Sequence, residues 1–542
     1  MRHRWRARQA YAQVTCVLVL TGCTSVRAEN SARADGSPGA RSGSAVLTLL
    51  HTNDLHGQLS EIAVDTGDAT AQTGDPGRSY QEYPRAGVIG GFARVATAVE
   101  QIRRERGAGN VLLVDAGDTF GDGLLANVTR GAATLRMMDA LGYQFMALGN
   151  HDFEYGAERT LALQRLVRFP LRAANAVLVS TSEPFGGEAM QVLIAGGVRV
   201  GLLALAYHNT DQTGNKDNTR GLSFTSGIDA ARRLVPLLRA RADIVVVVSH
   251  QGTAIDSVLA EQVEGIDVIV GGHAHDRIEP PRRVRNTWLA QALSDATALG
   301  ELRIRYENGR VAQVGGWVHE LYADRFAPHP AFTRMLDSIR APFQDTLSAV
   351  VALAAERIGR QYKSESPVDR LAAEMLREWA RADVAFLPGV GFGVTLQPGP
   401  VTREMLVGLF PHPAPVVHLK LTGEQLRAVL EQSATNLRPA RAEDRVGGLI
   451  QSAGLRYTID LGKPVGERIG AVTVGADGLD LRRSYDIVTT GGLLQGTHRQ
   501  TVFAQGTVIR RDSLQVTAVL ESRLRAMRMV RAPAAGAVTI VP

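Results

Sequence analysis

The sequence predicts a layered α/β domain followed by a smaller α+β domain. Between Ala45 and about Tyr322, short apolar runs alternate with stretches of helical spacing, which is the arrangement expected of α/β layers. From Val350 on, this alternation gives way to a mixture of short strands and helices. A length of 542 residues also exceeds that of one typical domain, so we expect two domains.

Five apolar runs each end in a cluster of Asp, His or Asn residues. Continuous apolar runs of this length predict strands buried on both faces, and ligands of open α/β sheets bind where such strands end. The runs are residues 47–50, 111–114, 145–148, 244–248 and 266–270, and the clusters are 51–56, 115–118, 149–152, 249–252 and 271–275. Five strand ends would thus bring metal-ligating side chains to one crevice, which indicates an enzyme.

The elements between these strands complete the first domain. The sequence predicts helices over residues 91–106, 132–141, 158–167 and 228–241. The polar, Gly-rich stretch 61–84 is expected to form a loop over the site. Residues 328–348 contain few turn signals and predict a helix that joins the two domains.

In the second domain, short strands and helices are expected in turn. Helices are predicted over residues 367–381, 402–410 and 422–432, and Thr402 and Thr422 are expected to cap the last two. Strands are predicted over residues 384–387, 456–459, 469–474 and 485–489.

These patterns divide the chain into six parts. They are a signal peptide (1–22), a flexible tether (23–44), the first domain (45–325), a linker helix (326–348), the second domain (349–530) and a tail (531–542).

Composition narrows the function classes. The net charge of +6 comes from Arg residues scattered among Asp and Glu, so we expect no nucleic-acid polymer as a partner. The two cysteines, Cys16 and Cys23, both lie near the N-terminus, which excludes an internal disulfide or a Cys-ligated zinc site in the folded body. We expect a monomer.

The pattern of the N-terminus predicts a targeting segment. Residues 1–8 are strongly basic, residues 10–20 are apolar, and Leu-Thr-Gly-Cys ends at Cys23. This resembles a bacterial lipoprotein signal, in which the Cys becomes lipidated, and the apolar stretch is too short to span a bilayer. We therefore expect an exported, lipid-anchored protein of the cell envelope, facing the periplasm or the surface, most simply on the outer membrane. An ordinary secretory signal cleaved near Ala28 is the alternative.

Seven side chains at the strand ends have the chemistry of metal ligands. Asp54 and His56 alternate around Leu55, which places both on one side of an extended segment. Oxygen and imidazole ligands without thiolate suit Zn, Mn, Fe or Co. Seven ligands exceed the need of one ion and suit two ions about 3.5–4 Å apart that share a carboxylate. The seven are Asp54, His56, Asp118, Asn150, His250, His273 and His275.

Four blocks of this series resemble the calcineurin-like metallophosphoesterases. They are Asn-Asp-Leu-His-Gly at 53–57, Ala-Gly-Asp at 116–118, Gly-Asn-His-Asp-Phe-Glu at 149–154 and Gly-Gly-His-Ala-His at 271–275. Within that group, the chain resembles the bacterial secreted 5′-nucleotidase family, which includes 2′,3′-cyclic phosphodiesterases and UDP-sugar hydrolases. The resemblance implies a four-layer β-sandwich flanked by helices, linked to a smaller α+β C-terminal domain.

The resemblance also implies a role for each residue. Asp54, His56 and His275 would hold one metal ion. Asn150, His250 and His273 would hold the other, and Asp118 would bridge both. His151 would be the non-metal catalytic residue, oriented by Glu154, which stands where the family has Asp.

The mechanism implied is hydrolysis of a phosphate ester such as a nucleotide. Two divalent ions make hydroxide available near neutral pH by lowering the pKa of bound water. This metal-bound hydroxide would attack phosphorus in line, while the ions and His151 stabilise the developing negative charge.

The substrate-binding part departs from the family. Relatives clamp phosphate and base with an Arg and two aromatic rings, and residues 389–393, 411–414 and 491–494 lack them. Base stacking contributes about 1–3 kcal/mol per base, so their loss would weaken nucleoside binding. Phe392 or His412 are the candidates to substitute.

Two other functions compete with this one. Pro388-Gly389 followed by Phe392-Gly393 is similar to the second domain of thiosulfohydrolases of sulfur oxidation, which share this architecture but depart from Gly-Asn-His around Asn150. The other alternative is a surface binding protein whose catalysis has decayed, against which the intact ligand set argues.

Overall fold

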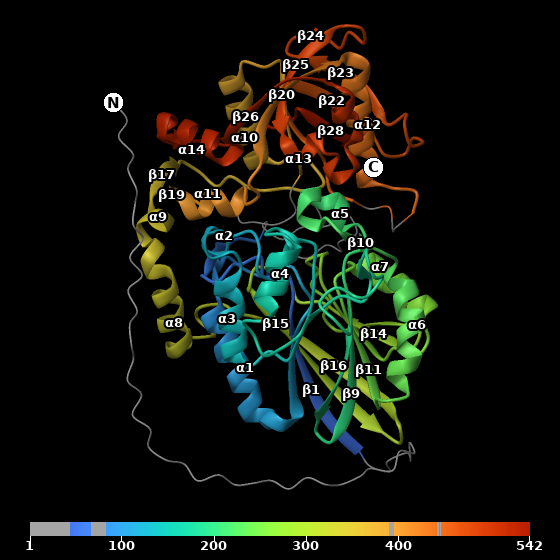
Figure 1. The fold of residues 1–542 in the computed structure, drawn as a ribbon. Coiled ribbons are helices and arrows are strands. Elements are labelled where there is room, and N and C mark those ends of the chain that lie inside the picture. The colour runs from blue at the N-terminus through green and yellow to red at the C-terminus, as the bar shows by residue number, and fades with distance from the viewer. Residues whose placement is uncertain (1–43, 67–82, 390–394, 442–443, 445, 542) are drawn as a thin grey trace, which may run out of the picture. The chain divides into compact units, whose positions relative to one another are not determined.

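The computed structural model (Figure 1) describes residues 44–66, 83–389, 395–441, 444 and 446–541. The expected signal peptide with Cys16 and Cys23, most of the tether, and the substrate candidate Phe392 lie outside the described residues. Within the described part of the chain, no helix combines the length and the apolar character needed to cross a bilayer.

The first of two six-stranded sheets carries three of the predicted strands. Its order is β16(Arg310–Glu320)-β15(Ala298–Glu307)-β1(Ser44–Thr52)-β4(Val111–Asp115)-β5(Phe145–Ala147)-β6(Leu171–Arg172). Strands β1, β4, β5 and β6 run parallel to one another. Their carboxyl ends therefore meet at one edge of the sheet.

The second six-stranded sheet carries the other two predicted strands. Its order is β13(Arg282–Val284)-β14(Thr287–Ala290)-β12(Val268–Gly271)-β11(Ile244–Ser249)-β9(Val198–Leu205)-β8(Met190–Ala195). Strands β9, β11, β12 and β14 are parallel, so they too deliver their following loops to a common edge.

The two sheets pack face to face between outer layers of helices. One buried cluster contains Leu49 of β1, Val114 of β4, Val200 of β9 and Val246 of β11, and so forms the core between the sheets. Helices α1(Phe92–Arg106) and α3(Ala132–Leu141) cover the outer face of the first sheet. Helices α6(Gly227–Arg239) and α7(Thr253–Gln262) cover that of the second. The predicted four-layer sandwich is confirmed.

The connection between the domains is not the single helix predicted over residues 328–348. It consists of α8(Pro330–Arg340), a 3₁₀ turn at Ala341–Phe343 and the short α9(Gln344–Ser348). Pro342 lies in that turn. Its missing N–H and its ring disfavour the interior of a long helix, so the prediction of one helix was wrong.

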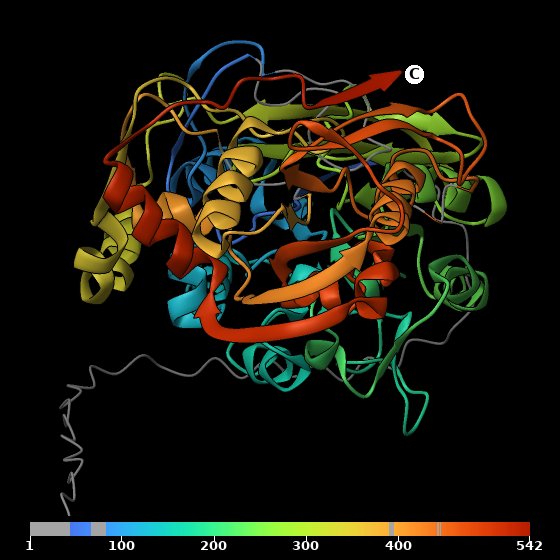
Figure 2. The same cartoon turned by 90° about the horizontal axis from the view of Figure 1, so that it is seen from above.

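A five-stranded sheet forms the centre of the second domain. Its order is β21(Gln451–Ala453)-β18(Val384–Leu387)-β25(Ser484–Thr490)-β20(Pro415–Thr422)-β26(Thr507–Gln515). Helices α10(Pro367–Ala380) and α14(Val516–Met527) pack on one face and α12(Gly423–Leu437) on the other. Figure 2 shows α10 and α14 together on one side of these strands and α12 on the opposite side.

Helix capping in this domain follows the sequence. The side chain of Thr402 accepts a hydrogen bond from the Met405 amide at the start of α11(Arg403–Leu409). Thr422 and Gln425 form a reciprocal capping box at the start of α12. Both caps satisfy backbone donors that a helix N-terminus leaves free.

Two smaller sheets complete the second domain. One has the order β19(Gly399–Thr402)-β17(Val350–Ala354)-β27(Met529–Val530), and the other β24(Asp477–Gly478)-β23(Ile469–Val474)-β22(Leu455–Asp460)-β28(Val538–Val541). Part of the segment predicted as a tail thus pairs in parallel with β22 as an edge strand.

Candidate metal centre

The site residues lie in loops directly after strands β1, β4, β5, β11 and β12, where the backbone is unusual. Non-glycine residues with positive φ are uncommon and cluster at functional sites. In these loops, six donor side chains have this conformation: Asp54 (φ 54°), His56 (48°), Asp118 (54°), Asp122 (81°), His273 (69°) and His275 (56°). The loops are therefore shaped by the site they carry.

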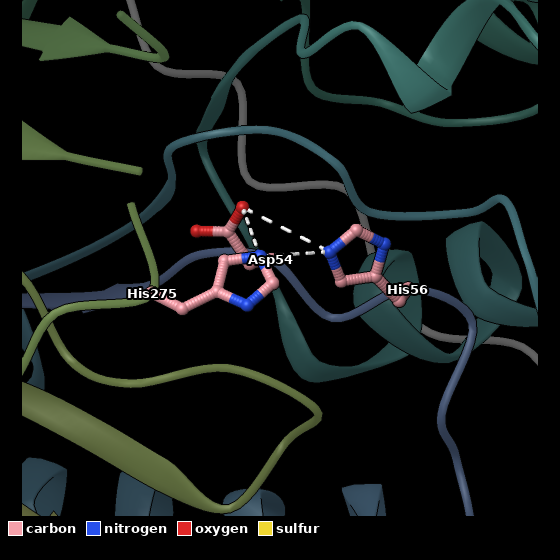
Figure 3. Close-up of side chains that lie close together, drawn as sticks. All are labelled: Asp54, His56 and His275. Atoms are coloured by element: carbon pink, nitrogen blue, oxygen red, sulfur yellow. Dashed lines mark hydrogen bonds and ion pairs between the residues drawn. The ribbon is translucent and has the colours of Figure 1, made fainter. Parts of the chain in front are cut away.

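Asp54, His56 and His275 form the first group of donors (Figure 3). The Nε2 atoms of His56 and His275 lie 3.1 Å apart. Asp54 Oδ1 lies 3.3 Å from His275 Nε2 and 3.9 Å from His56 Nε2. All three side chains are buried. Three buried donors this close together fit one ligand set for a divalent cation.

Asp118, His250 and His273 form the second group. Asp118 Oδ2 lies 2.9 Å from His250 Nε2. The side chain of Asn150 is buried beside the same cavity, and its Oδ1 has no hydrogen-bond partner among the described residues. A buried carbonyl oxygen without a partner is costly, so it fits the role of a neutral metal ligand.

The two groups lie side by side. Asp54 Oδ1 is 3.9 Å from His250 Nε2 of the second group, the same distance as from His56 Nε2 of its own. The structure therefore brings all seven predicted ligands to one place, as the order of the strand ends predicted. Their assignment to particular ions remains a prediction.

Backbone and carboxylate contacts set the direction in which two imidazoles face. His250 Nδ1 donates to the Ala116 carbonyl oxygen at 2.7 Å, which leaves Nε2 facing Asp118. His56 Nδ1 lies 2.7 Å from Asp122 Oδ2, which turns its Nε2 toward His275. Such outer contacts fix the ring orientation of metal-ligating histidines.

The electrostatics of the site couple metal binding to protons. Burial acts to lower the pKa of His250, but the adjacent Asp118 carboxylate outweighs it and raises this pKa to about 9. Burial acts to raise the pKa of Asp118, but His250 and neighbouring imidazoles outweigh it and hold this pKa well below its usual value. A metal ion that binds here must displace the His250 proton.

The Asp152 carboxylate connects two of these loops through hydrogen bonds. Its carboxylate accepts hydrogen bonds from the backbone amides of Asp118 (3.0 Å), Thr119 (2.8 Å), Phe120 (3.2 Å) and Gly149 (2.9 Å). Through them, the loop after β4 is fixed to the loop after β5. Asp152 is fully buried, and the sequence assigned it no role.

His151 has a carboxylate partner that the sequence analysis missed. Glu154 Oε1, the predicted partner, lies 3.4 Å from His151 Nδ1. Asp122 Oδ2 lies closer, at 3.2 Å from the same nitrogen. The available signal was the position of Asp122, four residues after Asp118 in the same strand-end loop.

A cavity of about 370 Å³ opens onto these donors. Its lining includes His56, Asp118, Asn150, His273 and His275 from the first domain, together with the substrate candidate His412. The second domain also lines it with four residues that the sequence did not single out: Tyr362, Phe410, His498 and Arg511. Phe410 could have been found from the sequence, because it is adjacent to segment 411–414, which departs from the family pattern.

Family models match both halves of the chain. The calcineurin-like phosphoesterase family matches residues 47–277, and the 5′-nucleotidase C-terminal domain matches residues 348–505. Bovine (Bos taurus) 5′-nucleotidase is 25% identical over 468 residues, which cover 78% of this chain and 77% of the relative. Rat (Rattus norvegicus) 5′-nucleotidase is 33% identical over 237 residues, which cover 42% of this chain and 38% of the relative.

Solved structures with the same two-domain fold include two from Thermus thermophilus. The sulfate thiohydrolase SoxB in complex with glycerol is 25% identical, with a TM-score of 0.83 over 94% of this chain and 98% of the other. A 5′-nucleotidase precursor is 25% identical, with a TM-score of 0.81 over 92% of this chain and 99% of the other.

The fold and the donor clusters define a metal-dependent phosphoric ester hydrolase of a class that uses a dimetal centre. The chain belongs to the 5′-nucleotidase family of calcineurin-like metallophosphoesterases, with both domains of that family present. The family and the enzyme class predicted from the sequence are confirmed.

Proposed function

We propose that this enzyme hydrolyses nucleotides or closely related phosphate esters. The observation that carries the proposal is the pair of adjacent donor groups that opens, beside His151, onto a cavity lined by both domains. The names of its relatives, 5′-nucleotidases among them, support a nucleotide as the substrate.

Seven side chains would hold two divalent ions. We assign Asp54, His56 and His275 to one ion, Asn150, His250 and His273 to the other, and Asp118 to both. The mixed oxygen and imidazole donors support Zn, Mn, Fe or Co. When bound, such ions supply an activated water and neutralise phosphoryl charge.

His151 would act on the phosphoryl or leaving oxygen. Burial acts to lower the pKa of His151, but the Asp122 carboxylate outweighs it and holds this pKa well above its usual value. This favours the protonated imidazole, which can donate a proton or a hydrogen bond to an oxygen that gains negative charge. Glu154, at 3.4 Å from Nδ1, would help to orient the ring.

Aromatic side chains of the second domain would contact the organic part of the substrate. Tyr362 and Phe410 both line the cavity, and Arg360 lies over the Phe410 ring at 5.1 Å. Stacking on such rings contributes about 1–3 kcal/mol per base. We assign them this role together with the sequence candidates His412 and Phe392.

Thiosulfohydrolysis is the second candidate reaction. The observation that favours it is the similarity to the sulfate thiohydrolase, with a TM-score of 0.83 over 94% of this chain. The Gly-Asn-His segment at 149–151 favours phosphate esters instead, because the thiosulfohydrolases depart from it.

A substrate panel separates the candidates. The purified chain, with added Mn²⁺ or Zn²⁺, is assayed for phosphate release from p-nitrophenyl phosphate, 5′-nucleotides, 2′,3′-cyclic nucleotides and UDP-sugars, and for sulfate release from thiosulfate. We expect phosphate release with nucleotides preferred. Sulfate release alone would establish the thiosulfohydrolase. A protein that shows no metal binding and no turnover would be the decayed binding protein.

We also propose that the protein is an exported monomer, anchored to the cell envelope by lipid on Cys23. Its proposed organisation has the six predicted segments, with α8, the 3₁₀ turn and α9 in place of a single linker helix. The Leu-Thr-Gly-Cys motif supports the anchor. Mass spectrometry of the mature N-terminus should find a lipidated Cys23, and Cys23→Ser should release the protein from membranes. An unmodified N-terminus near residue 29 would contradict the anchor.

A further inference from the structure

The buried carboxylate of Asp122 is shared by three imidazoles from separate parts of the chain. Its Oδ2 lies 2.7 Å from Nδ1 of His56 and 3.2 Å from Nδ1 of His151, both in the first domain. Its Oδ1 lies 2.8 Å from Nε2 of His412, which belongs to the second domain between α11 and β20. The carboxylate closest to His151 Nδ1 is therefore itself held by a side chain of the other domain.

The contact between His412 and Asp122 is an ion pair. Burial acts to lower the pKa of His412, but the carboxylates of Glu154 and Asp122 outweigh it and raise this pKa, which favours the charged imidazole. Within the described part of the chain, Asp122 Oδ1 has no well-aligned hydrogen bond. Without His412 this oxygen would be buried and unpaired, which costs free energy. The carboxylate would then turn toward other donors and away from His151.

His412 also packs directly against His151. The two rings stack with centroids 5.0 Å apart and an angle of 16° between their planes, and His412 Nε2 lies 3.1 Å from His151 Nδ1. Glu154 Oε1 is 3.4 Å from each of these nitrogens. The His151 ring is thus bounded on one face by His412 and at Nδ1 by two carboxylates, which restricts its rotation and keeps Nε2 available for the substrate.

The segment that carries His412 is held in place on the first domain. Pro411 and Pro413 flank it, and the prolines fix their own φ angles and restrict the residues before them. The Pro411 carbonyl oxygen accepts a hydrogen bond at 3.1 Å from Nδ2 of Asn127 in α2(Leu124–Thr129), the helix that follows Asp122. Two adjacent residues of the second domain are therefore attached to one short stretch of the first.

We propose that His412 is a positioning residue for His151, acting through Asp122 and through the stacked rings. The inference rests on the proposed role of His151 in ester hydrolysis. Because His412 belongs to the second domain, His151 is fully oriented only while the two domains are in contact at this segment. The role is compatible with a substrate contact, since 32% of the His412 side chain is exposed.

A double-mutant cycle on turnover of p-nitrophenyl phosphate tests the proposal. His412→Ala should lower kcat by about 10–10²-fold, because misplacing a reacting group by about 1 Å has an effect of this size. In the His151→Ala background the same substitution should lower kcat by less than about threefold, because the ring that it positions is absent. The coupling separates positioning from a lost substrate contact, which would have the same effect in both backgrounds.

Arg499→Ala is the matched control. Arg499 also connects the domains, but its described hydrogen bonds go to Gln212 (2.8 Å), Asn209 (3.4 Å) and Asp444 rather than to Asp122. This variant should change kcat by less than about threefold. A loss as large as that of His412→Ala would show that any weakened domain contact suffices, and would overturn the specific role of His412.

Two further results would overturn the proposal: an unchanged kcat in His412→Ala, or equal effects of this substitution in the two backgrounds. Equal effects with an activity that depends on His151 would refute the positioning alone. Full kcat in His151→Ala would instead refute the proposed role of His151, and with it this inference.

A crystal structure of the unchanged chain decides if His412→Ala fails to fold by circular dichroism or if the unchanged chain has no turnover. His412 Nε2 must lie within hydrogen-bond distance of Asp122 Oδ1, with the His412 ring stacked on that of His151. A His412 ring turned away from Asp122 would refute the positioning.

Discussion

Contacts to Nδ1 fix the orientation of two imidazoles of the site, those of His250 and His56. The Ala116 carbonyl oxygen holds His250 at 2.7 Å, and Asp122 holds His56 at 2.7 Å. The sequence predicted the ligand histidines because they follow apolar runs. It could not predict these partners, since a carbonyl oxygen has no residue signature and Asp122 resembles an ordinary turn residue between two glycines.

Replacement of His151 tests its role at the level of one side chain. His151→Ala should lower turnover of p-nitrophenyl phosphate by about 10²–10⁴-fold, the usual contribution of a general acid or charge-stabilising group. The two ions of the dimetal centre should remain, because His151 is not one of their seven proposed ligands. Metal analysis beside the assay checks this, and loss of those two ions together with activity would contradict the assignment.

Asp152 should matter for stability rather than for chemistry. Asp152→Ala leaves the buried amides of Asp118, Thr119 and Gly149 without their acceptor, and each unsatisfied donor costs about 1–3 kcal/mol. We expect a loss of about 3 kcal/mol or more, measured by calorimetry on metal-free protein. Asp217→Ala is the control: this exposed carboxylate pairs with Arg220 at the surface, and the variant should change stability by less than about 0.5 kcal/mol.

Among the elements, those with a strong apolar pattern were predicted well. Strands β18 and β23 have the predicted bounds, and α10 ends one residue before the prediction. Strand β26 was not predicted from the sequence. Nearly all its residues are exposed, so it has no apolar alternation to detect. The helix break at Pro342 was missed because no neighbouring turn residues accompany the proline.

Strand β15 must have glycine where it meets β1. Gly300 pairs with His51, and a Cβ on Gly300 would lie 2.0 Å from His51 Nε2. Gly300→Ala should therefore destabilise the protein by about 1–3 kcal/mol through overpacking. In neighbouring β16, a Cβ on Gly315 would meet nothing within 4 Å, so Gly315→Ala should be close to neutral. Equal melting temperatures for the two variants would contradict this packing.

His51, in the neighbouring strand β1, makes stability depend on pH. Burial lowers the pKa of His51 from 6.5 to about 4, so between these values the unfolded chain binds the proton that the folded chain excludes. Stability is unaffected by His51 above pH 6.5 and falls as the pH decreases from 6.5 toward 4. Because of His51, the free energy of unfolding at pH 5 is about 2 kcal/mol lower than at pH 7.

Removal of the imidazole isolates this effect. Between pH 7 and pH 5, the free energy of unfolding of His51→Leu should fall by about 2 kcal/mol less than that of the unchanged chain. Both are measured by urea unfolding in the presence of EDTA. Parallel pH profiles for the two proteins would show that His51 is not the group responsible.

For the molecule as a whole, the side-chain contacts between the two domains could not be predicted from the sequence. The strand ends could be placed together because parallel strands share an edge. The contact of His412 with His151 joins residues 261 positions apart in separate domains, and no periodic pattern encodes it. The same holds for Tyr362 and Phe410, which line the cavity from the second domain.

The most direct test of the account is to locate the metal ions in a crystal of the zinc-loaded enzyme by anomalous diffraction at the zinc edge. Two strong peaks should lie about 3.5–4 Å apart, one beside Asp54, His56 and His275 and the other beside Asp118, His250 and His273. A single peak among these side chains, or none, would contradict a dimetal hydrolase.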